Sequence, residues 1–345
     1  MKSATPKVLH RIGGRSLVGH AIVAARATNP HHLAVVVRHE RDLVAGHVGE
    51  VDASATIADQ DDVKGTGRAT ECALEVLPDG LSGTVLVTYG DVPLLTGETL
   101  VNLIARHEES GSAATVITAH LDDPQGYGRI VRDADGSVAG IVEQKDATEE
   151  QRAITEINSG IYAFDVEVLR TALAEVGTDN AQGEKYLTDV LAIAREQGRR
   201  VAAHVIDDLW QTEGVNDRVQ LARMGVEMNR RILERWMRAG VSVVDPQSTM
   251  IDAEVTLGRD CRLLPGTQVI GASTVGAGVT VGPDTTLVDV EVGDGATITR
   301  THAHLAKIGE GAHVGPFVHL RPGSTVDAGT KVAAFTELGA EGDQR

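Results

Sequence analysis

The first two hundred residues alternate short runs rich in β-branched residues with longer amphipathic stretches. Apolar positions at helical spacing predict helices at residues 17–27 and 99–109, and short apolar runs predict buried strands at residues 33–37, 84–88, 114–119 and 161–164. Strands that alternate with helices indicate an α/β fold, with βαβ units around a mostly parallel sheet. Ligands bind beyond the carboxyl ends of such strands, so residues that follow strands become candidates for chemistry.

From about residue 216 the alternation of short strands and helices gives way to one long run of helical spacing. Apolar residues keep this spacing to about Arg238, and Gly240 stands where a helix would end, which predicts a connecting helix over residues 216–240. Beyond it, one aliphatic residue recurs at intervals of six, with two interruptions: Ile251, Leu257, Leu263, Val269, Val275, Val281, Leu287, Val292, Ile298, Ile308, Val314, Leu320, Val326 and Val332. This period predicts a triangular solenoid with three hexapeptides in each coil. We therefore expect domains at residues 1–215 and 241–345, joined by the helix.

Composition narrows the possible partners. The chain has 38 glycines and only 3% aromatic residues, which suits a fold with many glycine-containing turns and a core of aliphatic side chains. Its net charge of −17 would repel nucleic acid and anionic lipid, so we expect neither a nucleic acid nor a membrane as partner. Cys72 and Cys261 lack the spacing of a disulfide framework or a zinc site. The first residues show no hydrophobic segment of the signal-peptide type, and we expect a cytoplasmic protein.

Two residues are candidate ligands for a metal ion. Asp91 follows a predicted buried strand, where its carboxylate could hold a divalent cation such as Mg²⁺ bound to phosphate. Asn216 could supply a second, neutral oxygen ligand. Two other interpretations stay open at this point: Asp91 could form a turn before Val92 and Pro93, and Asn216 could cap the connecting helix.

A glycine-bearing loop near residue 65 could contact a nucleotide. Gln60, Gly65 and Thr66 precede a predicted helix, and such a loop exposes backbone N–H groups and permits close approach of a base or phosphate. Lys7, beside the rigid Pro6, could neutralise a triphosphate. The competing interpretations are an ordinary turn and a solvated lysine near the start of the chain.

Three further loops follow predicted strands and carry polar groups suited to sugar hydroxyls, at residues 126–129, 143–146 and 158–160. None of them is specific when taken alone. The thirteen histidines form neither a His-Glu-x-x-His pattern nor a Ser-His-Asp arrangement, so the sequence gives no support to a hydrolase.

Taken in order, these clusters resemble the bifunctional bacterial family of N-acetylglucosamine-1-phosphate uridylyltransferase / glucosamine-1-phosphate acetyltransferase. The resemblance runs from Pro6 to about Val332 and rests on these motifs: Pro6-Lys7-Val8-Leu9-His10, Gln60 with Gly65-Thr66-Gly67, Tyr89-Gly90-Asp91-Val92-Pro93-Leu94, Gly126-Tyr127-Gly128-Arg129-Ile130, Glu143-Gln144-Lys145-Asp146, Asn158-Ser159-Gly160, Tyr186-Leu187-Thr188-Asp189 and Gly214-Val215-Asn216. It implies a Rossmann-like (GT-A-like) nucleotidylyltransferase domain, a connecting helix and a left-handed parallel β-helix of the acetyltransferase type.

The resemblance also implies a role for each candidate. Lys7 would be the catalytic residue and contact phosphate, Asp91 and Asn216 would hold Mg²⁺, and the uridine nucleotide would be contacted by Gln60, Gly65 and Thr66. Sugar-phosphate substrates would be contacted by Tyr89, Gly128, Glu143, Asn158 and, for the acetyl acceptor, Arg321. The implied reactions are uridylyl transfer from UTP to N-acetylglucosamine-1-phosphate and acetyl transfer from acetyl-CoA to glucosamine-1-phosphate, by a homotrimer that feeds peptidoglycan and lipopolysaccharide synthesis.

The chain departs from the family pattern at both ends. The family's first strand and its Gly-x-Gly-Thr-Arg loop have no counterpart after Met1, so we expect uridylyl transfer slowed by about 10³-fold or more. Gly339 stands at the position of an expected lysine, and the coils that carry the family's catalytic histidine and acetyl-CoA contacts are missing, so we expect no acetyl transfer. The alternative hypotheses are a nucleotidylyltransferase for another sugar phosphate and a non-catalytic scaffold.

Overall fold

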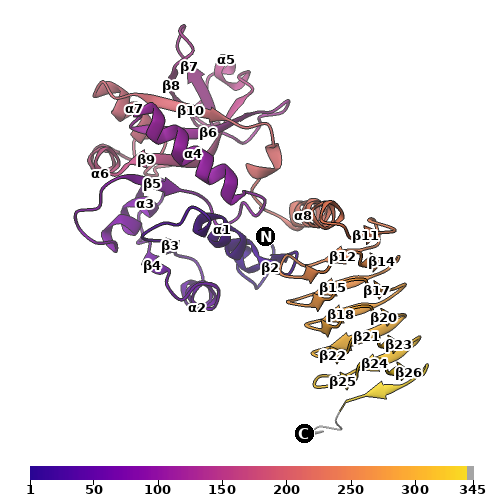
Figure 1. The fold of residues 1–345 in the computed structure, drawn as a ribbon. Helices are drawn as coiled ribbons and strands as arrows, with labels where there is room; N and C mark the ends of the chain where they lie inside the picture. The colour runs from indigo at the N-terminus through magenta and orange to yellow at the C-terminus, as the bar shows by residue number, and fades with distance from the viewer. Residues whose placement is uncertain (340–345) are drawn as a thin grey trace. The chain divides into compact units, whose positions relative to one another are not determined.

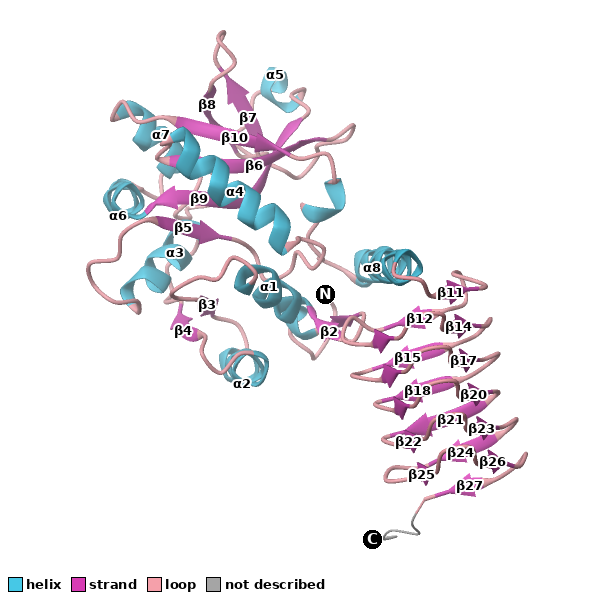
Figure 2. Ribbon diagram, in the orientation of Figure 1, coloured by secondary structure: helices cyan, strands magenta, loops and turns pink. Residues whose placement is uncertain are grey.

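The computed structural model describes residues 1–339, so residues 340–345, at the end of the predicted second domain, lie outside the described range. Contacts divide the chain into two compact units. The first comprises Met1–His10 and Ser16–Arg218, and the second comprises Arg11–Arg15 and the chain from Val219 onward. The first unit combines helices with a mixed sheet, and the second stacks short strands in coils (Figures 1 and 2).

The first unit is built around a six-stranded sheet. Its order is β10-β6-β9-β7-β8, and β5 also pairs with β9. These strands are β5 Thr84–Val87, β6 Ala114–His120, β7 Arg129–Arg132, β8 Val138–Val142, β9 Glu156–Asp165 and β10 Val201–Val205; β3 Ala34–Val37 and β4 Thr56–Asp59 form a separate parallel pair. The helices are η1 Lys7–Leu9, α1 Leu17–Arg26, α2 Arg41–Val51, α3 Thr66–Glu75, α4 Gly97–Ser110, α5 Glu149–Arg152, α6 Val166–Glu175, α7 Asp189–Glu196 and η2 Leu209–Gln211.

The predicted strands and helices exist, but the expected parallel sheet is wrong. Within the six-stranded sheet, only β10 and β6 pair in parallel, whereas β9 runs antiparallel to β5, β6 and β7. A parallel return to the sheet needs a crossover of a dozen or more residues, usually a helix. Between β6 and β9 the chain forms the β7-β8 hairpin and only a four-residue helix, α5, so β9 re-enters the sheet antiparallel. The expected burial holds for β6 and β9, while β3 and β5 are mostly half-buried.

The second unit is a parallel β-helix preceded by α8 (Arg218–Arg238). Its short strands form three sheets that repeat once per coil. The first contains β11 Ser242–Val243, β14 Arg262–Leu263, β17 Thr280–Val281, β20 Thr297–Ile298, β23 His313–Val314 and β26 Lys331–Val332. The second contains β12 Met250–Ile251, β15 Gln268–Ile270, β18 Thr286–Val288, β21 Thr301–His304, β24 Val318–Leu320 and β27 Glu337–Leu338. The third contains β13 Thr256–Leu257, β16 Thr274–Val275, β19 Glu291–Val292, β22 Lys307–Ile308 and β25 Thr325–Val326.

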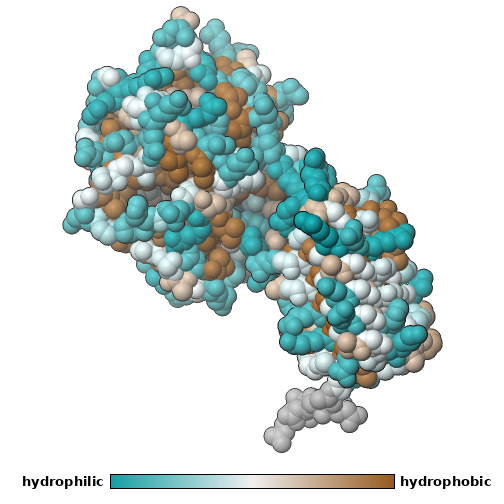
Figure 3. Space-filling view, in the orientation of Figure 1, coloured by the Kyte–Doolittle hydropathy of each residue, from teal (hydrophilic) through white to brown (hydrophobic). Residues whose placement is uncertain are grey.

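The hexapeptide prediction is confirmed, since all of the predicted inward positions from Ile251 to Val332 are buried. Ala303 fills the place in the interrupted stretch that the pattern missed: it is fully buried and lies in register between Leu287 and Leu320. An alanine breaks the aliphatic signal without leaving the interior. Outward positions carry mainly threonine and other polar residues, and the visible face of this unit is largely of intermediate hydropathy (Figure 3). Throughout residues 1–339, no helix is long and apolar enough to cross a membrane.

A hairpin from the start of the chain belongs to the second unit. It consists of β1 (Arg11–Ile12) and β2 (Arg15–Ser16), and the Gly13 carbonyl accepts a hydrogen bond of 2.9 Å from the Ala253 N–H. Gly14 has a φ of +79°, and a Cβ there would lie 2.5 Å from Asp252 Oδ2. Glycine at this position thus permits both the turn and the close approach to the first coil.

We predict that Leu287→Ala lowers the free energy of unfolding by about 2–5 kcal/mol, because Leu287 is fully buried inside a coil and its truncation leaves a cavity. The matched control Thr274→Ala shortens an exposed, outward side chain of β16 and should change stability by less than about 0.5 kcal/mol. Urea unfolding followed by circular dichroism measures both. Equal losses for the two variants would contradict a packed aliphatic interior.

Candidate active site

The structure brings three of the predicted residues together in the first unit. Lys7 lies in η1, Asp91 follows β5, and Asn216 lies just before α8. The Lys7 Nζ donates to Asp91 Oδ2 at 2.5 Å and to Asn216 Oδ1 at 3.2 Å. A cationic group therefore sits between a carboxylate oxygen and an amide oxygen that come from distant parts of the sequence.

Backbone contacts explain this convergence. The Val215 N–H donates to the Asp91 carbonyl at 3.0 Å, which ties the segment before α8 to the loop after β5. At Gly214, a Cβ would lie 3.7 Å from both carboxylate oxygens of Asp91, so the two segments run close together.

The chemistry of these oxygens fits a divalent cation. A carboxylate and an amide oxygen are hard donors of the kind that Mg²⁺ prefers, and Mg²⁺ commonly takes one or two protein ligands and completes its shell with water and phosphate. Among residues 1–339 there is no group of three or more His, Cys, Asp or Glu side chains suited to a metal. An ion held by Asp91 and Asn216 would accordingly depend on substrate oxygens for the rest of its ligands.

A second cluster gathers three predicted sugar contacts. The Asn158 N–H donates to the Gly128 carbonyl at 2.9 Å, which joins β9 to the loop before β7. A Cβ at Gly128 would lie 3.4 Å from Glu143 Oε1 and 3.5 Å from Asn158 Cβ, so glycine leaves this space open. The Asn158 side-chain oxygen accepts from the Tyr162 hydroxyl at 2.8 Å and from the Gly160 N–H at 2.9 Å, and these bonds fix its orientation.

Tyr89 lies between the two clusters. Burial, with the nearby negative charges of Glu143 and Asp91, raises the pKa of Tyr89 to about 12, so its hydroxyl stays protonated at neutral pH. Gly160 makes room for it: this residue has a φ of +78°, and a Cβ there would overlap the Tyr89 ring. The predicted motif at residues 158–160 therefore positions the Tyr89 ring as well as the Asn158 amide.

The surroundings of Glu143 disfavour its ionised form. Its burial, together with the charges of Asp146 and Asp189, raises its pKa above the usual value. Burial and Asp146 raise the pKa of Asp189 in the same way. Partly buried carboxylates that repel one another weaken a fold, and such arrangements are typical of sites selected for function.

The loop predicted to contact a nucleotide is held by a segment that the sequence reasoning did not assign. The Gln60 side chain donates to the Gly65 carbonyl at 3.1 Å, and the Thr66 hydroxyl accepts from the Leu187 N–H at 3.1 Å. Gly65 has a φ of +116°, and a Cβ there would clash with the Lys185 backbone. Lys185 also forms an ion pair with Glu71. Lys185 is far from Gly65 in sequence, so local patterns could not predict this contact. The family motif at residues 186–189, which directly follows Lys185, was the one sign that this segment belongs to the site.

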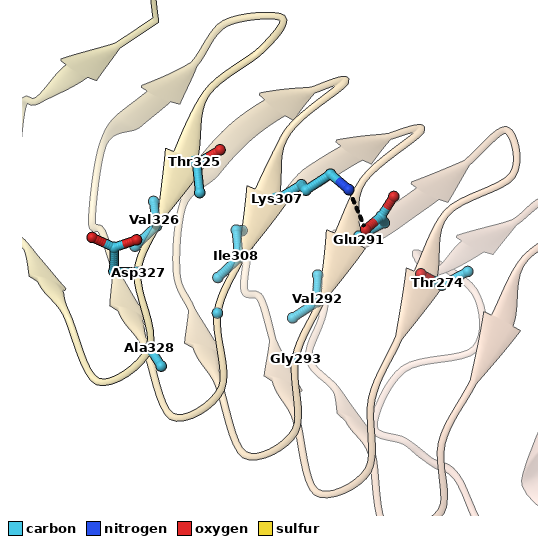
Figure 4. Close-up of a pocket in the computed structure, with 11 residues that line it drawn as sticks. Thr274, Glu291, Val292, Gly293, Lys307, Ile308, Thr325, Val326, Asp327 and Ala328 are labelled. Atoms are coloured by element: carbon cyan, nitrogen blue, oxygen red, sulfur yellow. Dashed lines mark ion pairs between the residues drawn. The ribbon is translucent and has the colours of Figure 1, made fainter.

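Arg321 lies apart from the other candidates, in the second unit. Its Nε donates to Glu337 Oε1 at 2.6 Å, and His319 contacts the same carboxylate at 3.1 Å. The second unit also has a shallow hollow across β16, β19, β22 and β25, where Lys307 pairs with Glu291 at 2.9 Å (Figure 4). None of the predicted site residues lines this hollow.

Comparisons with known proteins agree on one family. The sequence profile described as Nucleotidyl transferase matches residues 2–219. The bifunctional protein GlmU of Pseudarthrobacter chlorophenolicus is 63% identical over 339 residues, which are 98% of this chain and 69% of that protein. GlmU of Paenarthrobacter aurescens is 62% identical over 98% of this chain and 68% of its own length, and GlmU of Kineococcus radiotolerans is 57% identical with the same coverage.

We predict that Glu143→Gln stabilises the protein at pH 8. The folded state raises the pKa of Glu143, so ionisation of this group destabilises the fold once the pH exceeds that raised value. The advantage of the variant should shrink as the pH falls through the raised pKa toward the ordinary glutamate range. Thermal unfolding at a series of pH values measures it.

Glu156→Gln is a control of opposite sign. Burial, the largest single influence, raises the pKa of Glu156, but the hydrogen bonds and charge of Arg132, with contributions from Thr118 and His120, together outweigh it and lower the pKa. This substitution should destabilise the protein at pH 8, with a loss that disappears as the pH falls through the lowered pKa. The electrostatic account of Glu143 would be wrong if both variants lowered the melting temperature at pH 8.

Gly160→Ala should cost about 1–3 kcal/mol more than Gly136→Ala in the free energy of unfolding. Both glycines have similar positive φ values, +78° and +83°, so backbone strain is matched. Only the Cβ at residue 160 meets the Tyr89 ring, whereas a Cβ at residue 136 has no heavy atom within 4 Å. Urea unfolding compares the two, and an equal cost would show that the Tyr89 ring yields freely.

Proposed function

We propose, because the chain belongs to the GlmU family of nucleotidyl transferases, that it transfers the uridylyl group of UTP to N-acetylglucosamine-1-phosphate. The products are UDP-N-acetylglucosamine, a precursor for peptidoglycan and lipopolysaccharide synthesis, and pyrophosphate. The observation that carries this proposal is the convergence of Lys7, Asp91 and Asn216 on one point.

The reaction needs charge neutralisation more than covalent catalysis. An oxygen of the sugar phosphate attacks the α-phosphorus of UTP; a new oxygen–phosphorus bond forms, the bond to the β-phosphate bridging oxygen breaks, and pyrophosphate leaves with the electron pair. Negative charge accumulates on the transferred group and on the leaving group. In this proposal the Lys7 ammonium neutralises part of that charge, and Asp91 and Asn216 would hold Mg²⁺, whose charge would polarise the phosphate oxygens.

Positioning supplies the remainder of the rate enhancement. The backbone at Gly65 and Thr66, with Gln60, would hold the uridine nucleotide. Glu143 and Asn158 would accept and donate hydrogen bonds to the sugar, in the space that Gly128 leaves open. The protonated hydroxyl and buried ring of Tyr89 would border both substrates, since Tyr89 feels the charges of Asp91 and Glu143.

The second activity of the family is acetyl transfer from acetyl-CoA to the amine of glucosamine-1-phosphate, in which the Arg321 guanidinium would bind the phosphate of the acceptor. We do not propose this activity for the chain, since Arg321, which pairs with Glu337, is the one candidate residue that the resemblance assigns to it. A homotrimer and a cytoplasmic location complete the proposal, by the same resemblance.

Pyrophosphate release from UTP and N-acetylglucosamine-1-phosphate with Mg²⁺ tests the first activity. We expect Asp91→Asn to lower the rate at least about tenfold, because the variant weakens the hold on the cation. Asp133→Asn is the matched control: it removes a partly exposed carboxylate that pairs with Arg195 in the same unit, and it should leave the rate within about twofold.

Substrate exchange separates the remaining hypotheses. Replacing UTP by ATP, or the sugar phosphate by glucose-1-phosphate, should reduce the rate. A faster rate with glucose-1-phosphate would favour a transferase for another sugar. Release that Asp91→Asn leaves unchanged would contradict the proposal.

A further inference from the structure

Lys7 occupies the place where a divalent cation would bind. Its Nζ contacts Asp91 Oδ2 and Asn216 Oδ1 together, so the ammonium bridges the two oxygens that would ligate an ion. Oxygens that ligate a metal need a positive charge between them, and here the chain's own lysine provides it. The Lys7 ammonium thus keeps the two candidate ligand oxygens facing the same point.

The two cations cannot share this position. Mg²⁺ binds oxygen at about 2.0–2.1 Å, and the Lys7 ammonium already approaches the same carboxylate oxygen at 2.5 Å. A doubly charged ion beside the ammonium would experience strong repulsion at such a separation. Entry of the ion between Asp91 and Asn216 therefore requires the ammonium to leave.

The Lys7 side chain can move its ammonium away from Asp91 and Asn216 while the Lys7 backbone stays fixed. The Leu9 N–H donates to the Pro6 carbonyl at 3.0 Å and the His10 N–H to the Lys7 carbonyl, which holds the backbone in the single turn η1. The Lys7 side chain is 34% exposed, so the four-carbon stem can swing its ammonium toward water or toward a phosphate.

We propose that Lys7 is an internal placeholder for the metal ion: it keeps Asp91 and Asn216 oriented, resists divalent cations that arrive alone, and is displaced when an ion binds. This inference rests on the proposed function, since the displaced ammonium then turns to the phosphates of a nucleoside triphosphate. Ion and nucleotide consequently help each other, because the ion frees the lysine and the phosphates give it a new partner.

Binding of Mn²⁺ in the absence of nucleotide tests the proposal. Electron paramagnetic resonance of free Mn²⁺ gives its dissociation constant for the full chain and for Lys7→Met. Methionine has a similar length but no charge and only a thioether, a poor ligand for a hard cation. We expect Lys7→Met to bind Mn²⁺ at least about threefold more tightly, since no ion pair must be broken first.

Two further variants make the result decisive. Lys307→Met also removes a lysine paired with a carboxylate, Glu291, so it changes the net charge equally, and it should leave Mn²⁺ affinity within about twofold. Asp91→Asn, introduced into Lys7→Met, should abolish the tight binding.

Each contrary result has a separate meaning. Equal or weaker Mn²⁺ binding by Lys7→Met overturns the placeholder while the Asp91 metal site stands. A gain of the same size in Lys307→Met overturns it as well, because the effect would come from net charge alone. Tight binding that survives Asp91→Asn overturns both the placeholder and the metal site of the proposed function. No binding by any variant overturns the placeholder alone, because removal of the ammonium would then not open the site to an ion without nucleotide.

Discussion

The hydrogen bond from the Val215 N–H to the Asp91 carbonyl is the contact on which the candidate site depends. It joins the loop after β5 to the segment before α8, and these two segments are far apart in sequence. A backbone bond is less sensitive to side-chain substitution than a side-chain contact, so it holds the two backbone segments together whatever their side chains do. The Asp91 and Asn216 side chains therefore start from neighbouring backbone positions, and Lys7 can bridge their oxygens.

The strands of the first unit position the other candidate residues, which lie at strand ends or within a strand. Gln60 directly follows β4, Glu143 directly follows β8, and Asn158 lies within the long strand β9. Glycines create the space beside them: Gly128 beside Glu143, and Gly160 beside the Tyr89 ring. The cost is electrostatic, because Glu143 and Asp189 remain partly buried near other carboxylates.

Much of this architecture follows from the sequence alone. Period six is a strong signal, because each coil must bury one aliphatic side chain per face. It is interrupted between Leu287 and Val292, which are five residues apart, and around Ala303, whose small side chain does not register as aliphatic. The strand direction in the first unit could not be predicted. Hydrophobic periodicity indicates which residues are buried but not the direction in which a strand runs. The antiparallel pairing of β9 follows from the β7-β8 hairpin, which stands where a crossover helix was expected.

The site was predictable only in part, for a related reason. Spacing placed Asp91 and Asn216 as separate oxygen donors, and the resemblance joined them as ligands, but no sequence pattern indicated that Lys7 would bridge them. The backbone of Lys185 behind Gly65 was likewise hidden, because a contact between distant backbone segments leaves no mark on local periodicity. Long-range backbone pairing is the information that a single sequence lacks.

The hairpin at Gly13 has a consequence for the order in which the protein is made. Its residues are synthesised well before its partner Ala253, which belongs to the first coil of the second unit. At a typical rate of chain elongation, the hairpin waits roughly 10 to 50 seconds for the residues against which it packs. During that interval the Gly13 carbonyl lacks its backbone partner, so the second unit can be completed only after the residues of its first coil have emerged.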